Sequence, residues 1–234
     1  MITLSDYITD NISESILSST RTGKVHLDEE LKMYGLYPAN ATLNADGSID
    51  YDGNVNLNSK NLTNFFKLPF RFRKVNGSFY CSHNNLTTLE GCPEEVANNF
   101  FCDNNNLTSL KGGPKQVGCH YYCMFNKLTT LEGAPERIEA YFSCSNNNLT
   151  NFNHCPQVIN GSFFCHHNQL TSLKGGPAQV SGEYDCAYNQ LTSLEGLPKK
   201  LRDKLICYNN PGKFTVKDVL KVCSINKYYI KTLI

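Results

Sequence analysis

Apolar residues recur along most of the chain at fixed positions of one unit, and this unit repeats every 21 residues. It reads F-x-C-x-x-N-x-L-T-x-L-x-G-x-P-x-x-V, so short apolar stretches alternate with runs of Asn, Thr, Ser and Lys. The first copy lies 24 residues before the second, because "FRFRKV" adds three residues. The cysteine position is filled by Leu57, Cys81, Cys102, Cys123, Cys144, Cys165, Cys186 and Cys207. A fixed period of about 20 to 50 residues is typical of a solenoid.

The unit follows the leucine-rich repeat pattern L-x-x-L-x-L-x-x-N-x-L. Its aromatic residue and its cysteine are two positions apart, so both point to one face of a short strand, the inward face. The Asn side chain has donors and an acceptor that can satisfy backbone groups where the chain turns. Pro removes a donor and fixes φ, which favours an extended return segment over a helix. We therefore predict an α/β fold: a leucine-rich repeat solenoid with a single curved parallel β-sheet of about eight rungs and an extended or 3₁₀-like convex side.

The two ends of the chain depart from the repeat, as the capping of a solenoid requires. Apolar residues at helical spacing beside Ser5 predict a helix at about residues 5–18, and "HLDEELKMYG" predicts a second, short helix. Asp46-Gly47 predicts a hairpin, and Thr215 with Asp218 predicts a capping box before a helix that closes the edge of the sheet. The predicted division is an N-terminal helical segment at 1–20, a cap of helix and hairpin at 25–54, the repeats at 55–212 and a C-terminal helical cap at 213–234.

The repeated cysteines are predicted to pack as small buried side chains, because free Cys is among the most buried residue types. The alternative is metal binding, for which zinc sites use close pairs such as C-x₂₋₄-C. Cys119 and Cys123 are the only pair near that spacing, and Cys123 belongs to the ladder. The total of eleven is odd, and the start shows no secretory signal pattern, which indicates a reduced intracellular protein. We expect no metal and no cofactor.

Composition changes this picture little. The chain has 22 basic and 21 acidic residues, and near-neutral charge argues against a nucleic-acid partner, which needs a basic stripe. No apolar run is long enough to span a membrane, so no membrane contact is expected. Charges of opposite sign alternate at equivalent positions of successive rungs, as in Glu94 and Lys115, and such pairs help to fix the stacking register.

A second set of strand positions varies from rung to rung, as a recognition surface does. Residues one before, one after and two after each cysteine are predicted to point to the concave side. The candidates for protein binding there are Tyr80, His83, Phe101, Tyr122, Met124, Phe125, Phe164, His166, His167 and Tyr188. Aromatic residues and Met are enriched in the buried parts of protein interfaces, and dense exposed aromatics are typical of a binding surface. The alternative is that these rings pack on one another or beneath a terminal segment.

Catalysis is not expected from this sequence. His83, His166 and His167 could act as bases or ligands, but no carboxylate or nucleophile recurs beside them in the repeat frame. The glycines of "KGGP" and "EGAP" belong to the convex turn of each rung rather than to a phosphate-binding loop. We therefore predict that the protein is not an enzyme.

The sequences of the repeats resemble those of known families. "LTSLEGLPKKL" is similar to the short leucine-rich repeats of bacterial effector proteins. "NADGSIDYDGNVNLNSKNLT" followed by "VNGSFYCSHNNLTTLEGCP" resembles leucine-rich repeat proteins encoded by large bacteriophages, some of which are described as similar to rII-type lysis-inhibition proteins. "ISESILSSTRTGK" resembles an N-terminal tract of other phage proteins. The resemblance covers residues 41–210 and implies the fold; effector relatives that are ubiquitin ligases carry a large catalytic domain after the repeats, so that activity is not expected here.

Two hypotheses for function remain. The first is a non-enzymatic interaction module of a large bacteriophage that captures a host or phage protein on its concave aromatic face, in counter-defence or host takeover. The second is a structural, virion-associated protein that docks through its N-terminal helix. We expect a monomer with one protein partner, located in the cytoplasm of the bacterial host or in the virion.

Overall fold

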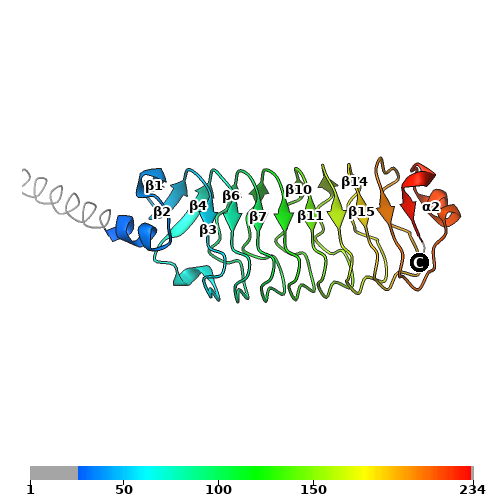
Figure 1. Cartoon of the computed structure of the whole chain (residues 1–234), viewed down its shortest axis with the longest axis horizontal. Helices are drawn as coiled ribbons and strands as arrows, with labels where there is room; N and C mark the ends of the chain where they lie inside the picture. Colours follow the sequence, from blue (N-terminus) through cyan, green and yellow to red (C-terminus); the bar gives the residue numbers. More distant parts are fainter. Residues whose placement is uncertain (1–25, 233–234) are drawn as a thin grey trace, which may run out of the picture.

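The computed structural model describes residues 26–232, which form one elongated β-solenoid (Figure 1). Each turn contributes a two-residue strand to a nine-stranded sheet. The predicted fold class, a parallel-sheet solenoid consistent with leucine-rich repeats and poor in helix, is confirmed. The predicted helix at residues 5–18 lies outside the described residues.

The nine-stranded sheet contains all eight predicted rungs, and the ninth strand comes from the C-terminal segment. Its strand pairs are parallel and in register, as in Phe100 opposite Tyr121. In each of the eight rungs the strand ends one residue before the cysteine position. The strands are β3 (Val55–Asn56), β5 (Phe79–Tyr80), β7 (Phe100–Phe101), β9 (Tyr121–Tyr122), β11 (Phe142–Ser143), β13 (Phe163–Phe164), β15 (Tyr184–Asp185), β16 (Leu205–Ile206) and β17 (Ile230–Lys231).

The opposite side of the solenoid also carries strands, which corrects the prediction of a single sheet. They form a five-stranded sheet, β1-β2-β4-β6-β8, and a three-stranded sheet, β10-β12-β14. The first sheet begins with β1 (Ala41–Leu43) and β2 (Ser48–Tyr51). The extended course predicted for this side is confirmed, and one turn there is a 3₁₀ helix, η2 (Phe65–Lys67). The repeated Val or Ile of x-x-V points inward, and its extended backbone pairs with the next turn. The strands are β4 (Arg71–Val75), β6 (Glu95–Val96), β8 (Gln116–Val117), β10 (Arg137–Ile138), β12 (Val158–Ile159) and β14 (Gln179–Val180).

This opposite array is interrupted between β8 and β10. Gly118 N donates to Val96 O at 3.0 Å, and Asn160 N donates to Ile138 O at 2.9 Å. At the equivalent position of the turn between them, Glu139 N has no hydrogen-bond acceptor within residues 26–232. The nine-stranded sheet stays paired across the same two turns through β9 and β11, so the solenoid is continuous.

We expect the amide hydrogen of Glu139 to exchange with solvent at least about tenfold faster than those of Gly118 and Asn160, because exchange of a paired amide requires local opening. Residue-resolved hydrogen–deuterium exchange measures the difference. Gly118 and Asn160 are matched controls, since they occupy the same position of neighbouring turns. Equal protection of the three amides would contradict the interruption.

Inside the solenoid, side chains from equivalent positions stack into columns. The ladder cysteines are 0–1% exposed and form no disulfide, so they pack as small apolar groups. Their thiols also reach backbone carbonyls of the next rung, as in Cys123 Sγ to Ser143 O at 3.2 Å. The aromatic column is continuous beside them, with the rings of Phe142 and Phe163 stacked at 5.8 Å.

The Asn ladder satisfies the backbone where each strand ends, as its repeat position predicts. Asn147 Nδ2 donates to Cys123 O, Cys144 O and Ser145 O, each at 3.1 Å, and its Oδ1 accepts from Leu128 N at 2.9 Å. Equivalent bonds recur from Asn84 to Asn210. Each ladder Asn therefore ties its own turn to the preceding one.

Both ends are capped as predicted, with one addition. Residues 26–33 are helical, and after the short η1 (Pro38–Asn40) the strands β1 (Ala41–Leu43) and β2 (Ser48–Tyr51) form the hairpin around Asp46-Gly47. At the other end, Thr215 and Asp218 form the capping box of α2 (Val216–Val222). The addition is β17, which follows η3 (Lys227–Tyr229) and pairs with β16. Within residues 26–232 no helix is both long and apolar enough to cross a membrane.

Candidate protein-binding surface

The outer face of the nine-stranded sheet is formed by the three variable columns predicted to be concave. All ten predicted binding residues lie on this face, but they differ in exposure. Tyr80, Phe101, Tyr122, Met124, Phe164 and His166 are partly buried, whereas His83, Phe125, His167 and Tyr188 are exposed. Phe125 is 51% exposed and Tyr188 is 40% exposed, and each lies in the bend that follows its strand.

The exposed column has an unusual backbone conformation. The residue two after each cysteine is left-handed, with φ of 55° at His83, 53° at Phe125, 54° at His167 and 52° at Tyr188. The remaining ladder positions of this column hold Asn104, Asn146 and Asn209, the residue type that tolerates this conformation best after Gly. A bulky residue there costs about 1 kcal/mol or more. Histidine, like Asn, is enriched in this conformation. Phe125 and Tyr188 are therefore the two exposed rings that stand at a position where they weaken the fold.

The first column forms a row of rings in contact. Tyr80 and Phe101 are stacked, 5.0 Å apart with ring planes 9° from parallel, whereas Phe101 and Tyr122 lie 5.2 Å apart with ring planes tilted by 54°. Two further rings join the row, and the sequence reasoning missed both. His120 stacks on Tyr122 at 5.7 Å, and Tyr141 contacts His120 at 4.6 Å. The available signal was that other turns place Asn, Ser, Glu or Lys at this position, three before the cysteine.

Ser143 interrupts this row and leaves a hollow of about 310 Å³, which we call the notch. Two small side chains form its floor, where Ser143 Oγ and Ser145 Oγ lie 3.1 Å apart. Ser143 pairs in register with Tyr122 on one side and with Phe164 on the other, so an aromatic residue flanks it on each neighbouring strand. The notch is lined by Tyr122, Met124, Phe125, Ser143, Ser145, Asn146, Phe164 and His166.

A second group of rings borders the notch toward the C-terminus. His166 Nδ1 and His167 Nδ1 share a hydrogen bond of 2.9 Å, and His167 stacks on Tyr188 at 4.1 Å. Burial lowers the pKa of His166, so this imidazole is neutral at pH 7. Burial also raises the pKa of the neighbouring Asp185 carboxyl. The predicted residues Tyr122 to Tyr188 thus form one continuous surface, whereas His83 lies apart from the notch.

Metal and thiol chemistry find little support on this surface. Within residues 26–232 no group of three or more His, Cys, Asp and Glu side chains is arranged to hold a metal ion. Cys119 and Cys123 are the pair nearest to the spacing of zinc ligands. They differ in burial, because Cys123 is buried and Cys119 is partly exposed. Burial raises the pKa of the Cys102 thiol well above its ordinary value and that of Cys207 to about 12.

We expect a thiol reagent to modify one cysteine, Cys119, in the folded protein and all eleven after unfolding, because the other ten are buried and only the thiolate reacts. A colorimetric thiol count with and without denaturant measures both numbers. Cys119→Ser is the control, and it removes the native signal. Rapid modification of several thiols in the folded protein would contradict the buried ladder.

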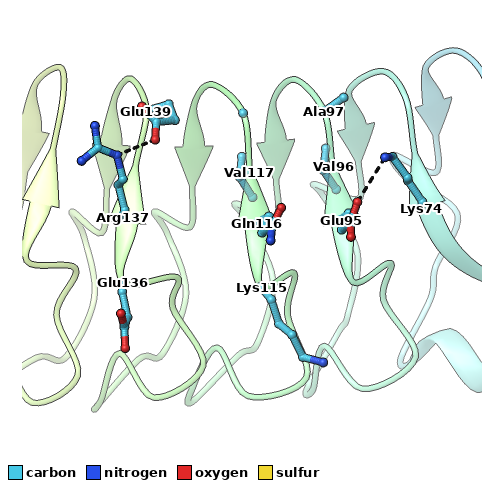
Figure 2. A pocket seen from close by; sticks show the side chains of 11 residues that line it. Lys74, Glu95, Val96, Ala97, Lys115, Gln116, Val117, Glu136, Arg137 and Glu139 are labelled. Carbon is cyan, nitrogen blue, oxygen red and sulfur yellow. Dashed lines mark hydrogen bonds and ion pairs between the residues drawn. The ribbon is translucent and has the colours of Figure 1, made fainter.

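A larger hollow of about 580 Å³ lies on the opposite side, across β6, β8 and β10 (Figure 2). Its three cations are paired: Lys74 with Glu95 at 3.2 Å, Arg137 with Glu139 at 2.6 Å and Lys115 with Glu94 at 3.2 Å. The Glu94–Lys115 pair is one of the register-fixing contacts predicted from the alternating charges. Because its cations are already neutralised by carboxylates, this hollow is a poor anion site, and the outer face is the better candidate surface.

No protein-family model matches the chain, and no curated protein matches its sequence. The fold and the surface nevertheless define a class: a solenoid repeat protein with a regular interior and an irregular aromatic outer face.

Proposed function

We propose that the chain is a non-enzymatic protein-binding module that recognises a partner protein on its outer face. The observation that carries the proposal is the row of rings from Tyr80 to Tyr122, which ends in an open apolar notch. Aromatic side chains that line a preformed hollow are typical of the energetic centres of protein interfaces.

The backbone beneath this face supports a binding role. It is held by the ladder of parallel strands and buried Asn side chains, so the rings are fixed before a partner arrives. Fixed rings lose little conformational entropy on association, which favours affinity. The left-handed backbone of Phe125 and Tyr188 also supports a binding role, because strained backbone of this kind clusters at functional sites.

The resemblance to repeat proteins of large bacteriophages suggests where the partner is found. Under the proposal, the module acts inside an infected bacterial cell and binds a host or phage protein there. The near-neutral net charge of +1 and the paired cations of the opposite side favour protein over nucleic acid as the partner.

We expect Phe101→Ala and Tyr122→Ala to weaken partner binding by roughly 2 kcal/mol or more each, with a nearly unchanged melting temperature. The partner is captured from bacterial lysate on the immobilised chain and identified by mass spectrometry. A double variant at Phe101 and Tyr122 is compared with a matched double variant on the opposite side, Lys111→Ala with Glu132→Ala.

A protein retained by the wild type and by the opposite-side variant, but lost with the Phe101 and Tyr122 variant, supports the proposal. Capture that is indifferent to both double variants would contradict it. Absence of any protein whose retention depends on Phe101 and Tyr122 would contradict it as well.

A further inference from the structure

The notch lies where one ring of the aromatic row is missing. Ser143 occupies the position that Tyr80, Phe101, Tyr122 and Phe164 occupy in other rungs. Its neighbours Tyr122 and Phe164 are therefore two rungs apart, a backbone separation of about 9.6 Å. Within the row, adjacent rings lie 5.0 and 5.2 Å apart. The gap between Tyr122 and Phe164 thus has the width of one more ring of this row.

No aromatic ring of residues 26–232 is stacked in this gap, but Ser143 at its base is only 3% exposed, so neighbouring side chains already cover it. Tyr141, which directly precedes β11, approaches Phe164 edge-on, with ring planes at 89° and centroids 6.3 Å apart. The nearest flexible side chain is Met124, whose Sδ lies 3.6 Å from Ser143 Oγ. Met adapts its shape to an incoming group and makes favourable contacts with aromatic rings, so it suits the wall of a ring-binding slot.

From this geometry we infer that the notch binds one aromatic side chain of the partner protein, which inserts between Tyr122 and Phe164 and completes the stack above Ser143. This inference rests on the proposed function and names its central contact. A planar ring between two aromatic residues gains offset or edge-to-face contacts on both sides and buries a large apolar area.

Charge indicates what surrounds the inserted ring. From Asn56 to Asn209, the three columns of the outer face contain Asp103 and Asp185 but no Lys or Arg. Asp103 lies two rungs before the rung of Ser143, and Asp185 lies two rungs after it. A partner segment with Lys or Arg beside its aromatic residue therefore complements this face, whereas one with Glu or Asp does not.

The chain contains no tryptophan, so the fluorescence of a Trp peptide reports its own environment without background. The probe is the peptide acetyl-Lys-Trp-Lys-amide, titrated with the full chain. We expect saturable binding with a Kd of about 1 mM and a blue-shifted emission. The peptide acetyl-Glu-Trp-Glu-amide should bind at least about tenfold more weakly, and acetyl-Lys-Leu-Lys-amide should not compete.

Ser143→Phe fills the notch with the kind of ring that other rungs carry. It should therefore keep the fold and lower the affinity for the Lys-Trp-Lys peptide at least about tenfold. Ser181→Phe is the matched control, because the exposed Ser181 lies beside β14 on the opposite side and should leave the Kd within about twofold. Circular dichroism confirms that both variants are folded. If Ser143→Phe does not fold, Ser143→Leu blocks the slot without an aromatic ring and gives the same expected loss.

Several outcomes would overturn the inference. These are no saturable binding of the Lys-Trp-Lys peptide to the wild type, binding that is unaffected by Ser143→Phe, or equal affinity for the Leu peptide. Concentration-dependent dimerisation that Ser143→Phe abolishes would assign the slot to a second copy of the chain instead. If a captured partner requires Phe101 and Tyr122 but binds the Ser143→Phe variant normally, the ring-binding role of the notch is wrong and the proposed function still holds. If capture is unchanged by substitutions at all three positions, both the inference and the proposed function are wrong.

Discussion

Replacing Asn147 by Asp is expected to lower the free energy of unfolding by about 4 kcal/mol at pH 7. The substitution keeps the Oδ1 that accepts from Leu128 N but replaces the amide that donates to Cys123 O, Cys144 O and Ser145 O. A carboxylate there faces three carbonyl oxygens in a buried site. The folded protein therefore holds this carboxyl protonated, with a pKa well above the value in the unfolded chain.

The sign of the pH dependence follows from that shift. Stability is least affected below the unfolded pKa of about 4, where the carboxyl is protonated in both states, and it is lost as pH rises from there. Denaturant unfolding at pH 4 and pH 7 measures the change. Asn148→Asp is the matched control, because Asn148 is exposed beside the ladder and its change should be small at both pH values. An Asn147→Asp protein as stable as the Asn148→Asp protein at pH 7 would contradict the structural role of the ladder.

Deleting residues 213–234 is expected to cause aggregation or unravelling from the last rungs. The deletion removes Phe214, Val219, Cys223 and Ile225, which are 0–9% exposed against the end of the core. It also removes β17, whose Lys231 O accepts from Cys207 N at 2.9 Å. An open, apolar sheet edge is a template for pairing with another chain.

Size-exclusion chromatography and thermal melting followed by circular dichroism report the outcome. Leu220→Ser is the control, since Leu220 lies on α2 but is 47% exposed and contributes little to the cap. A truncated chain that stays monodisperse with the melting temperature of the full chain would show that the C-terminal segment is not a cap.

The regular part of this molecule could be predicted from the sequence, because several copies of one unit show the role of each position more clearly than a single copy does. The interior roles of the cysteine and Asn positions were predicted from their spacing, and Cys123 and Asn147 occupy those roles. The hairpin and the capping box were predicted from local turn and helix signals at Asp46-Gly47 and at Thr215.

What was missed depends on contacts between turns rather than on the repeat itself. The strands on the opposite side and their interruption at Glu139 depend on whether successive backbones approach closely enough to pair. The two-residue strand β17 carries too little pattern to predict. The ten surface candidates lie on one face, and their role in binding stays a prediction. The notch was missed because it arises from an absence, Ser143 in a column that is aromatic on the neighbouring strands.

The most direct test of the outer face uses its one methionine. The chain contains three methionines, Met1, Met33 and Met124, of which Met124 lines the notch and Met33 is 80% exposed on the N-terminal helical residues. With methyl-¹³C-methionine, NMR follows the Met124 methyl while a captured partner protein is added, and Met33 serves as the internal control. Recognition on the outer face predicts a large shift or broadening of the Met124 signal at saturation and an unchanged Met33 signal. Saturated binding with an unchanged Met124 signal would contradict it.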